Sequence, residues 1–180
     1  MSRIGKKPIE IPEKVSVDIT NGKIALKGPL GELDWVFPNR IKVSQDGNAL
    51  IIERGSDEKS DRALHGLTRS IISNMVTGVS QGYTKVLSIV GVGYKAQVLE
   101  NKIVFSLGYS HPIEFPMPDG IKATVDQKQV QLTLTGIDKQ KIGQFAAYIR
   151  TLRPPDVYKG KGIRHAGERL KLKVGKAGKK

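Results

Sequence analysis

The sequence contains two copies of one unit of roughly 80 residues. Residues of the first copy recur in the second in the same order: Lys23-Ile24 as Lys102-Ile103, Pro38 as Pro118, Ile41 as Ile121, Gly55 as Gly136, Asp57 as Asp138 and Arg69 as Arg150. The spacing between equivalent residues drifts only from 79 to 81. Matches in a constant order with so small a drift indicate an internal duplication. We therefore expect two similar units in tandem, one in residues 1–82 and the other in residues 83–152.

Each copy begins with short runs of alternating apolar and polar residues, which is the pattern of half-buried β-strands. The turn residues Asn21-Gly22, Gly28-Pro29 and Asp46-Gly47-Asn48 separate the runs of the first copy. The strands predicted there are residues 15–19, 23–27, 33–37, 41–43 and 50–54.

A helix is expected at the end of each copy. The apolar stripe of the first helix is Ala63, Leu64, Leu67, Ile71, Met75 and Val76. The stripe of the second is Ile142, Phe145, Ala146, Ile149 and Leu152, and Pro154-Pro155 end that helix. The fold class is therefore α+β, with two tandem duplicated lobes. Each lobe is an antiparallel sheet system with one covering helix, and a basic C-terminal extension follows.

The positive charge of the chain is concentrated at its C-terminal end. The whole chain carries 30 Lys and Arg against 17 Asp and Glu, a net charge of +13. Residues 1–83 contribute +2 and residues 84–152 contribute +3, whereas residues 153–180 contribute +8 from 10 basic and 2 acidic side chains. A basic end of this kind favours a polyanionic partner. Because the predicted strands and stripes end by Leu152, we expect the lobes to fold without residues 154–180.

The residue pattern of this basic end favours folded RNA. Proline and glycine alternate with Lys and Arg from Arg153 to Arg164, which suits a loop fitted to a folded RNA surface. Residues 169–174 then alternate basic and apolar side chains, a pattern that predicts a short strand with one basic edge. We expect Tyr158 to pack on RNA and seven side chains to neutralise phosphates: Lys159, Lys161, Arg164, Arg169, Lys171, Lys173 and Lys176.

Two further RNA-binding candidates are Arg153 and Lys95. The glycines of Gly91-Val92-Gly93-Tyr94-Lys95 would let a backbone approach RNA closely, with Lys95 on a phosphate and Tyr94 against a sugar or base. The same pattern is also typical of a glycine-rich hairpin with a structural role only, and Arg153 or Lys95 could pair with a surface acid instead.

No motif in the sequence predicts an enzyme, a cofactor or a metal site. Residues 78–82 match G-x-S-x-G, but that motif requires a strand before the serine and a helix after it. Here the predicted helix precedes Ser80 and a strand follows. The chain has no cysteine, and its three histidines, His65, His111 and His165, lack metal-ligand spacing. With neither an apolar leader nor a stretch of about 18 apolar residues, we expect no membrane segment and a cytoplasmic location.

Residues 154–164, Pro-Pro-Asp-Val-Tyr-Lys-Gly-Lys-Gly-Ile-Arg, closely resemble the signature of the bacterial ribosomal protein L6 family. The opening residues 1–9, the turn at residues 91–96 and the full length are similar to that family too. The resemblance implies a ribosome-bound structural protein that binds large-subunit ribosomal RNA, chiefly through the second lobe and tail. It also implies neighbouring large-subunit proteins near the base of the stalk, close to where GTPase translation factors dock, and no small-molecule substrate.

Two other functions compete with this interpretation. A DNA-binding module would explain the positive charge, but both predicted helices carry mixed charge and neither resembles a basic recognition helix. A hydrolase built on Ser80 is a distant third because the order of its flanking elements is reversed. Sedimentation with large ribosomal particles would separate these possibilities.

Overall fold

The computed structural model describes residues 5–20 and 22–176. The chain divides into two compact units: lobe 1 comprises residues 1–83 with 137–139, and lobe 2 comprises residues 84–136 and 140–180. Asn21 of the first predicted turn, residues 1–4 of the opening motif and residues 177–180 lie outside the described residues.

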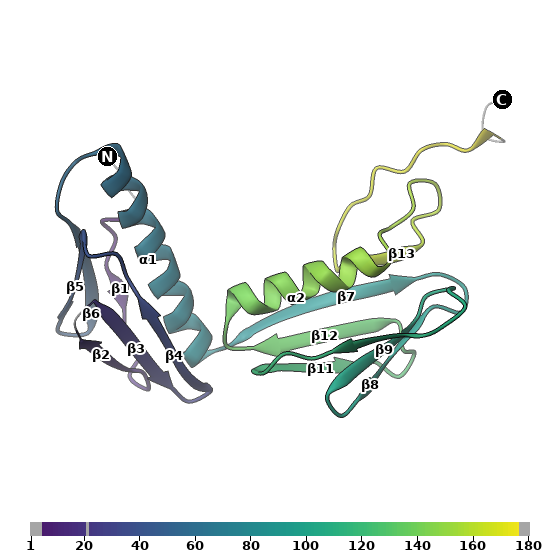
Figure 1. Ribbon diagram of the computed structural model, residues 1–180, viewed down its shortest axis with the longest axis horizontal. Helices are drawn as coiled ribbons and strands as arrows, with labels where there is room; N and C mark the ends of the chain where they lie inside the picture. The colour runs from purple at the N-terminus through teal and green to yellow at the C-terminus, as the bar shows by residue number, and fades with distance from the viewer. Residues whose placement is uncertain (1–4, 21, 177–180) are drawn as a thin grey trace. The chain divides into compact units, whose positions relative to one another are not determined.

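The described residues of lobe 1 form six strands and one long helix (Figure 1). The strands are β1 (Ile9–Glu10), β2 (Ser16–Thr20), β3 (Lys23–Gly28), β4 (Gly31–Val36), β5 (Ile41–Asp46) and β6 (Ala49–Arg54). They form two antiparallel sheets with the orders β2-β3-β4 and β1-β6-β5. Helix α1 (Lys59–Ser80) contacts strands β3 to β6. Five strands coincide within a few residues with those predicted for the first copy, and β1 is additional.

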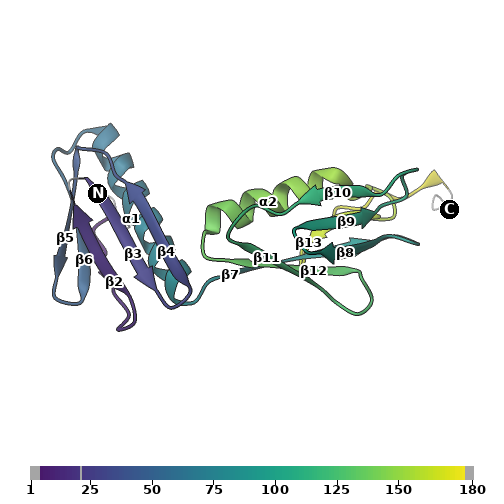
Figure 2. The same ribbon diagram turned by 60° about the horizontal axis from the view of Figure 1, so that its bottom comes forward.

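Lobe 2 repeats this arrangement (Figures 1 and 2). Its strands are β7 (Tyr83–Val90), β8 (Lys95–Leu99), β9 (Lys102–Ser106), β10 (Ile113–Pro116), β11 (Ile121–Val125), β12 (Gln131–Gly136) and β13 (Gly162–His165), and α2 (Lys139–Leu152) is its helix. The order β8-β9-β10 corresponds to β2-β3-β4, and β7-β12-β11 corresponds to β1-β6-β5. The duplication predicted from the residue spacing is therefore present in the strand order. Among the described residues of lobe 1, strand β13 has no counterpart.

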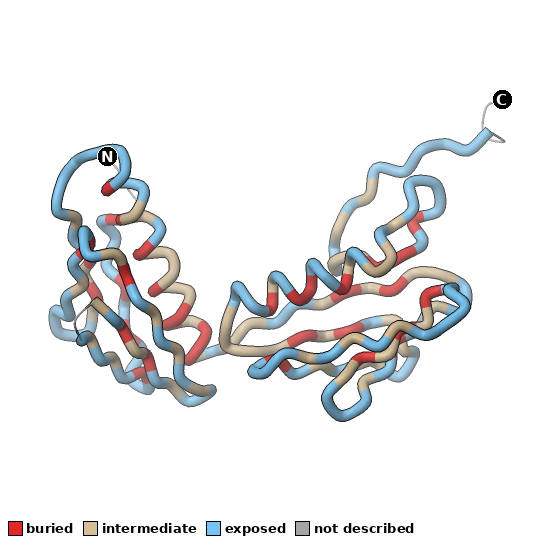
Figure 3. The backbone as a smooth tube through the Cα atoms, in the orientation of Figure 1, coloured by how far each residue is buried: buried red, intermediate tan, exposed pale blue. Residues whose placement is uncertain are grey.

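Each core lies between the sheets and the helix of its lobe (Figure 3). Alternate residues of the strands are buried, such as Ile24 and Leu26 in β3 and Leu132 and Leu134 in β12, because a strand directs successive side chains to opposite faces. The buried residues of α2 are Ile142, Phe145, Ala146 and Ile149. These four belong to the stripe predicted for the second helix.

The buried face of α1 differs from the predicted stripe. Leu67, a predicted core residue, is 53% exposed, whereas the side chains of Asp61, His65 and Thr68 are buried. The remaining buried positions continue along the same face with Ile72, Met75, Val76 and Val79. The apolar pattern gave the wrong phase at the start of this helix because three polar residues occupy its inner face.

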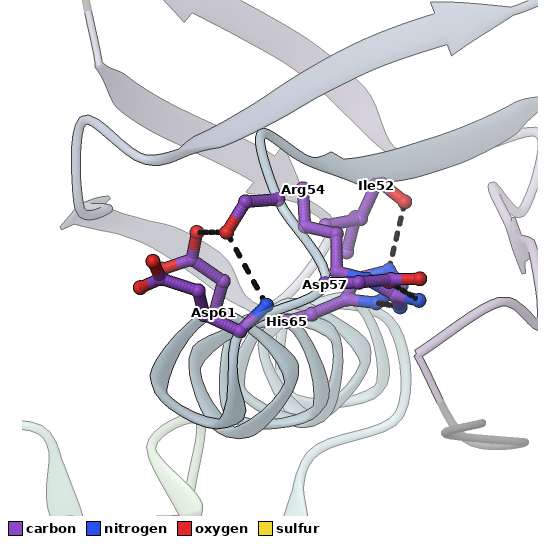
Figure 4. Close-up of polar contacts among 7 residues, drawn as sticks. Ile52, Arg54, Asp57, Asp61 and His65 are labelled. Atoms are coloured by element: carbon purple, nitrogen blue, oxygen red, sulfur yellow. Dashed lines mark hydrogen bonds and ion pairs between the residues drawn. The ribbon is translucent and has the colours of Figure 1, made fainter.

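Two of these polar residues are buried because they have hydrogen-bond partners (Figure 4). The His65 Nε2–H donates to the carbonyl oxygen of Ile52 at 2.9 Å, so Nδ1 is the acceptor for Nη1 of Arg54, also at 2.9 Å. The carboxylate of Asp61 accepts a 2.7 Å hydrogen bond from the Ser56 hydroxyl. Partners of this kind offset the cost of removing polar groups from water.

Two expectations for the C-terminal segment are wrong. The strand predicted at residues 169–174 is absent, and the observed strand is β13, earlier in the segment. The strands of lobe 2 therefore do not end by Leu152. Ile163 of β13 is fully buried, so the lobe uses part of this segment in its own core.

Candidate nucleic-acid interface

Strand β13 anchors the basic segment to lobe 2. It pairs antiparallel with β7, placing Gly162 opposite Val90 and His165 opposite Leu87. The Ala166 N–H extends the pairing to the Val86 carbonyl at 2.9 Å, and the Ile163 N–H reaches the Arg153 carbonyl at 2.8 Å. Hydrogen bonds on both sides of the strand fix the position from which the flanking basic loops leave the lobe.

Gly162 is required where β13 passes the end of α2. Its φ of 139° lies in a region that residues with a Cβ rarely adopt. A Cβ there would also lie 2.6 Å from the Pro154 carbonyl oxygen and 2.7 Å from that of Arg153. The glycine therefore lets the chain return along the backbone that has just left the helix.

Residues 156–160, which we call the Asp156 turn, form one helical turn between α2 and β13. The Asp156 carboxylate accepts hydrogen bonds from the N–H groups of Tyr158 at 3.2 Å and Lys159 at 2.9 Å. The Gly160 N–H closes the turn on the Asp156 carbonyl at 3.0 Å. The bond from the Lys159 N–H, followed by other backbone donors, lowers the pKa of Asp156 below its ordinary value. The carboxylate therefore acts as the N-cap of the turn that carries Lys159.

Residues 169–176 run back along the Asp156 turn. The Lys173 N–H donates to the Val157 carbonyl at 2.7 Å. A Cβ placed on Gly160 would lie 3.3 Å from Leu170 and 3.7 Å from Leu172, so both leucines lie against the turn. Two of the three apolar residues whose alternation predicted a strand therefore pack on this turn, whereas the third, Val174, is 78% exposed. Four basic residues of this stretch are exposed: Arg169, Lys171, Lys173 and Lys176.

Glu168, the second acid of the basic segment, also has a structural role. Its carboxylate forms a bidentate pair with Arg150 of α2, at 2.6 Å to Nη2 and 3.3 Å to Nε. It accepts the His165 N–H at 3.0 Å as well. The Arg150 hydrogen bond is the main reason why the pKa of Glu168 lies below its ordinary value. Glu168 therefore joins the end of β13 to the helix.

Arg153 and Lys95 lie beside a cluster of two tyrosines. The guanidinium of Arg153 lies over the Tyr109 ring, 4.8 Å from its centroid, and the Tyr109 hydroxyl donates to the Leu152 carbonyl at 3.0 Å. Cβ atoms at Gly91 and Gly108 would lie 2.6 Å and 2.9 Å from the Tyr94 ring. Tyr94 is thus packed on its own hairpin, which fits the structural interpretation of the glycine pattern, while Lys95 is exposed at the start of β8.

The remaining predicted residues are accessible to a partner. Tyr158 is 56% exposed, and both Lys159 and Lys161 are exposed beside it. Arg164 is half-buried in β13. Within residues 5–20 and 22–176, the salt bridges of Lys23, Arg40, Arg54, Lys102 and Arg150 involve none of the ten predicted RNA-binding residues. Sequence reasoning missed Asp156 and Glu168, although an acid followed by backbone donors in a proline–glycine segment is a recognisable turn signal.

The motif at residues 78–82 has the element order that disfavours a hydrolase. Ser80 is the last residue of α1, β7 follows it, and its hydroxyl donates to the Thr77 carbonyl at 3.2 Å. In the described part of the chain, no three potential metal-binding side chains come together. No helix there is long and apolar enough to cross a membrane.

Comparison with known proteins identifies relatives along the whole chain. The family model described as "Ribosomal protein L6" matches residues 11–82 and 90–166, one stretch in each lobe. The chain is 61% identical to large ribosomal subunit protein uL6 of Thermodesulfovibrio yellowstonii over 180 residues. It is 51% identical to the protein of the same name from Koribacter versatilis and 48% identical to that of a Picosynechococcus strain. Each match covers 100% of both chains.

Proposed function

Because the chain belongs to the ribosomal protein L6 family, and is therefore a structural protein of the large ribosomal subunit rather than an enzyme, we propose that it binds large-subunit ribosomal RNA. The contact is made mainly by lobe 2 and the basic segment, residues 153–180. The ten residues predicted from the sequence are the proposed contacts, with Lys and Arg on phosphates and Tyr158 packed on a sugar or base.

The observation that carries this proposal is the set of basic side chains on residues 159–176 outside the salt bridges of the described protein. The two acids of the segment are engaged elsewhere, Asp156 with backbone N–H groups and Glu168 with Arg150. The lysines and arginines therefore remain available for phosphates. Each phosphate contact releases counterions from the RNA, which favours binding at low salt.

The partners proposed beyond RNA rest on the family resemblance. They are neighbouring large-subunit proteins near the base of the stalk, close to the region where GTPase translation factors dock. Chemical crosslinking of assembled large subunits, followed by mass spectrometry, tests this location. Crosslinks confined to proteins far from the stalk base would contradict it.

RNA binding is tested by filter binding of the purified full-length chain to large-subunit ribosomal RNA over a series of salt concentrations. Replacing Arg169, Lys171, Lys173 and Lys176 by glutamine should lower the salt slope by about 3 units, at roughly 0.7 to 0.9 per phosphate contact. The control replaces Lys23, Lys27, Lys42 and Lys59 of lobe 1 by glutamine. Equal losses from both variants would show that the basic segment is not the principal contact.

A further inference from the structure

We propose that Asp156 is a positioning residue for RNA binding, because it holds the Asp156 turn in the conformation that presents Lys159 and Lys161. This inference rests on the proposed function. The inference adds that part of the affinity for RNA depends on one acidic side chain. By its charge alone, this side chain should weaken binding to a polyanion.

The hydrogen bonds of Asp156 define the shape of the turn. Its carboxylate accepts the N–H groups two and three residues ahead, which is the geometry of a helix N-cap. Gly160, with φ of 67°, ends the turn in the left-handed conformation usual after a helix. The Asp156 N–H donates in turn to the Lys161 carbonyl at 2.8 Å. Both lysines are therefore attached to backbone that Asp156 holds.

A second contact stabilises the same turn from the other side. Leu170 and Leu172 lie against Gly160, and the Lys173 N–H is bonded to the Val157 carbonyl. Lys171 and Lys173 thus belong to an irregular stretch that packs on the turn. Losing the Asp156 cap would loosen four lysines at once: Lys159, Lys161, Lys171 and Lys173.

Order before binding matters because a loop must adopt its bound conformation before all of its phosphate contacts can form. The apparent affinity falls by the fraction of molecules in which that conformation is populated. Replacing an Asp N-cap by Ala destabilises a helical turn, whereas Asn caps about as well as Asp. The two substitutions remove the same negative charge, so any difference between them measures the cap and not the charge.

The experiment compares wild type, Asp156→Ala and Asp156→Asn as full-length chains. Binding to in vitro transcribed large-subunit ribosomal RNA is measured across a salt series, and hydrogen exchange of the Tyr158 and Lys159 amides is followed without RNA. We expect Asp156→Ala to bind about tenfold more weakly than Asp156→Asn and to lose protection of both amides. Asp156→Asn should keep the protection and bind at least as tightly as wild type. Thermal unfolding should be alike in both variants because Asp156 lies on the surface.

A Lys159→Gln/Lys161→Gln double variant serves as the charge control. It should lower the salt slope by about 1 to 2 units, while Asp156→Ala keeps every lysine and leaves the slope unreduced. Equal affinities of Asp156→Ala and Asp156→Asn, with wild type still binding RNA, would overturn the positioning role alone. Amide protection that survives in Asp156→Ala would overturn it too. A wild-type chain that does not bind the RNA would overturn the proposed function and, with it, this inference.

Discussion

At the scale of single residues, Gly162 is a position where a methyl group should be costly for two independent reasons. The left-handed φ and the two carbonyl oxygens within 3 Å of a Cβ act together. We expect Gly162→Ala to destabilise lobe 2 by about 2 to 4 kcal/mol, from backbone strain and crowding combined. Gly167→Ala is the matched control, since Gly167 has φ of 79° but no atom within 4 Å of its Cβ. Thermal unfolding followed by circular dichroism should separate the two, and equal shifts would contradict the crowding argument.

Thr68 is a buried residue at which a substitution should raise the stability of lobe 1, in contrast to Gly162. Its side chain is fully buried in α1, and within the described residues its hydroxyl has no hydrogen-bond partner. Valine has nearly the same shape and a similar helix propensity. Thr68→Val should therefore stabilise lobe 1 by about 1 kcal/mol. The fluorescence of Trp35, the single tryptophan of the chain, reports lobe 1 in a urea titration. A clear loss of stability in Thr68→Val would show that the Thr68 hydroxyl has a hydrogen-bond partner.

Asp61 should make lobe 1 sensitive to acid. The Ser56 hydrogen bond, with smaller help from Arg40, lowers the pKa of Asp61 below its ordinary 3.8. The folded state therefore binds fewer protons than the unfolded state, and its stability falls as the pH drops through and below about 4. Asp61→Asn should reduce the acid dependence of unfolding detected by Trp35. Asp126→Asn, in lobe 2, should leave that dependence unchanged, and the reverse pattern would contradict the assignment.

At the scale of elements, the inner face of α1 can be tested by two truncations. Ile72 is fully buried, whereas Leu67, on the predicted stripe, is 53% exposed. We expect Ile72→Ala to cost about 2 to 4 kcal/mol, because it removes buried surface and leaves a cavity. Leu67→Ala should cost less than about 1 kcal/mol. Urea unfolding followed by Trp35 fluorescence measures both, and similar losses would mean that the face is assigned incorrectly.

The sequence was sufficient to predict most elements because their signals are local. Alternation and turn residues identified the five longer strands of lobe 1, and Pro154-Pro155 marked the end of α2 at Leu152. The phase of α1 could not be read from apolar residues alone, since Asp61 and His65 are buried through partners distant in sequence, such as Arg40 and Ile52. Strand β13 was missed because its sequence, Gly-Ile-Arg-His, has one apolar residue and owes its conformation to pairing with β7.

The two lobes differ at one equivalent sheet edge, formed by β7 in lobe 2 and by β1 in lobe 1. In lobe 2, the outer edge of β7 pairs with β13. In lobe 1, the equivalent strand β1 lies between Pro8 and Pro12, and proline offers no N–H to a further strand. Its inner side is used, as shown by the bond from the Ile11 N–H to the Asn48 carbonyl. In lobe 2 the edge of the sheet at β7 thus holds the strand that anchors the basic segment. In lobe 1 the corresponding edge at β1 disfavours pairing with a further strand.

At the scale of the whole molecule, the basic C-terminal segment has two parts. One part belongs to the fold of lobe 2, and the other follows it. The sequence favoured a removable tail beginning at Pro154, but residues 162–165 belong to the sheet of lobe 2 and Glu168 joins them to α2. Residues 153–168 therefore contain both part of the fold of lobe 2 and several of the proposed RNA contacts. Residues 169–180 carry six basic side chains and no acid, and none of the described ones is buried.

Two truncations should consequently behave differently. A chain that ends at Arg153 loses β13 with the fully buried Ile163, whose burial alone is worth about 2 to 3 kcal/mol. Lobe 2 should then unfold at lower temperature, and weak RNA binding by this variant would not report on RNA contacts.

A chain that ends at Glu168 keeps β13 and the Arg150 pair. It should unfold within a few degrees of wild type and bind large-subunit ribosomal RNA more weakly. Because four of the six removed cations are proposed phosphate contacts, its salt slope should fall by about 3 to 4 units. Tight binding with an unchanged slope in the Glu168 truncation would place the principal contacts within residues 153–168 or elsewhere on lobe 2. Equal thermal stability of the two truncations would contradict the role of β13 in the core.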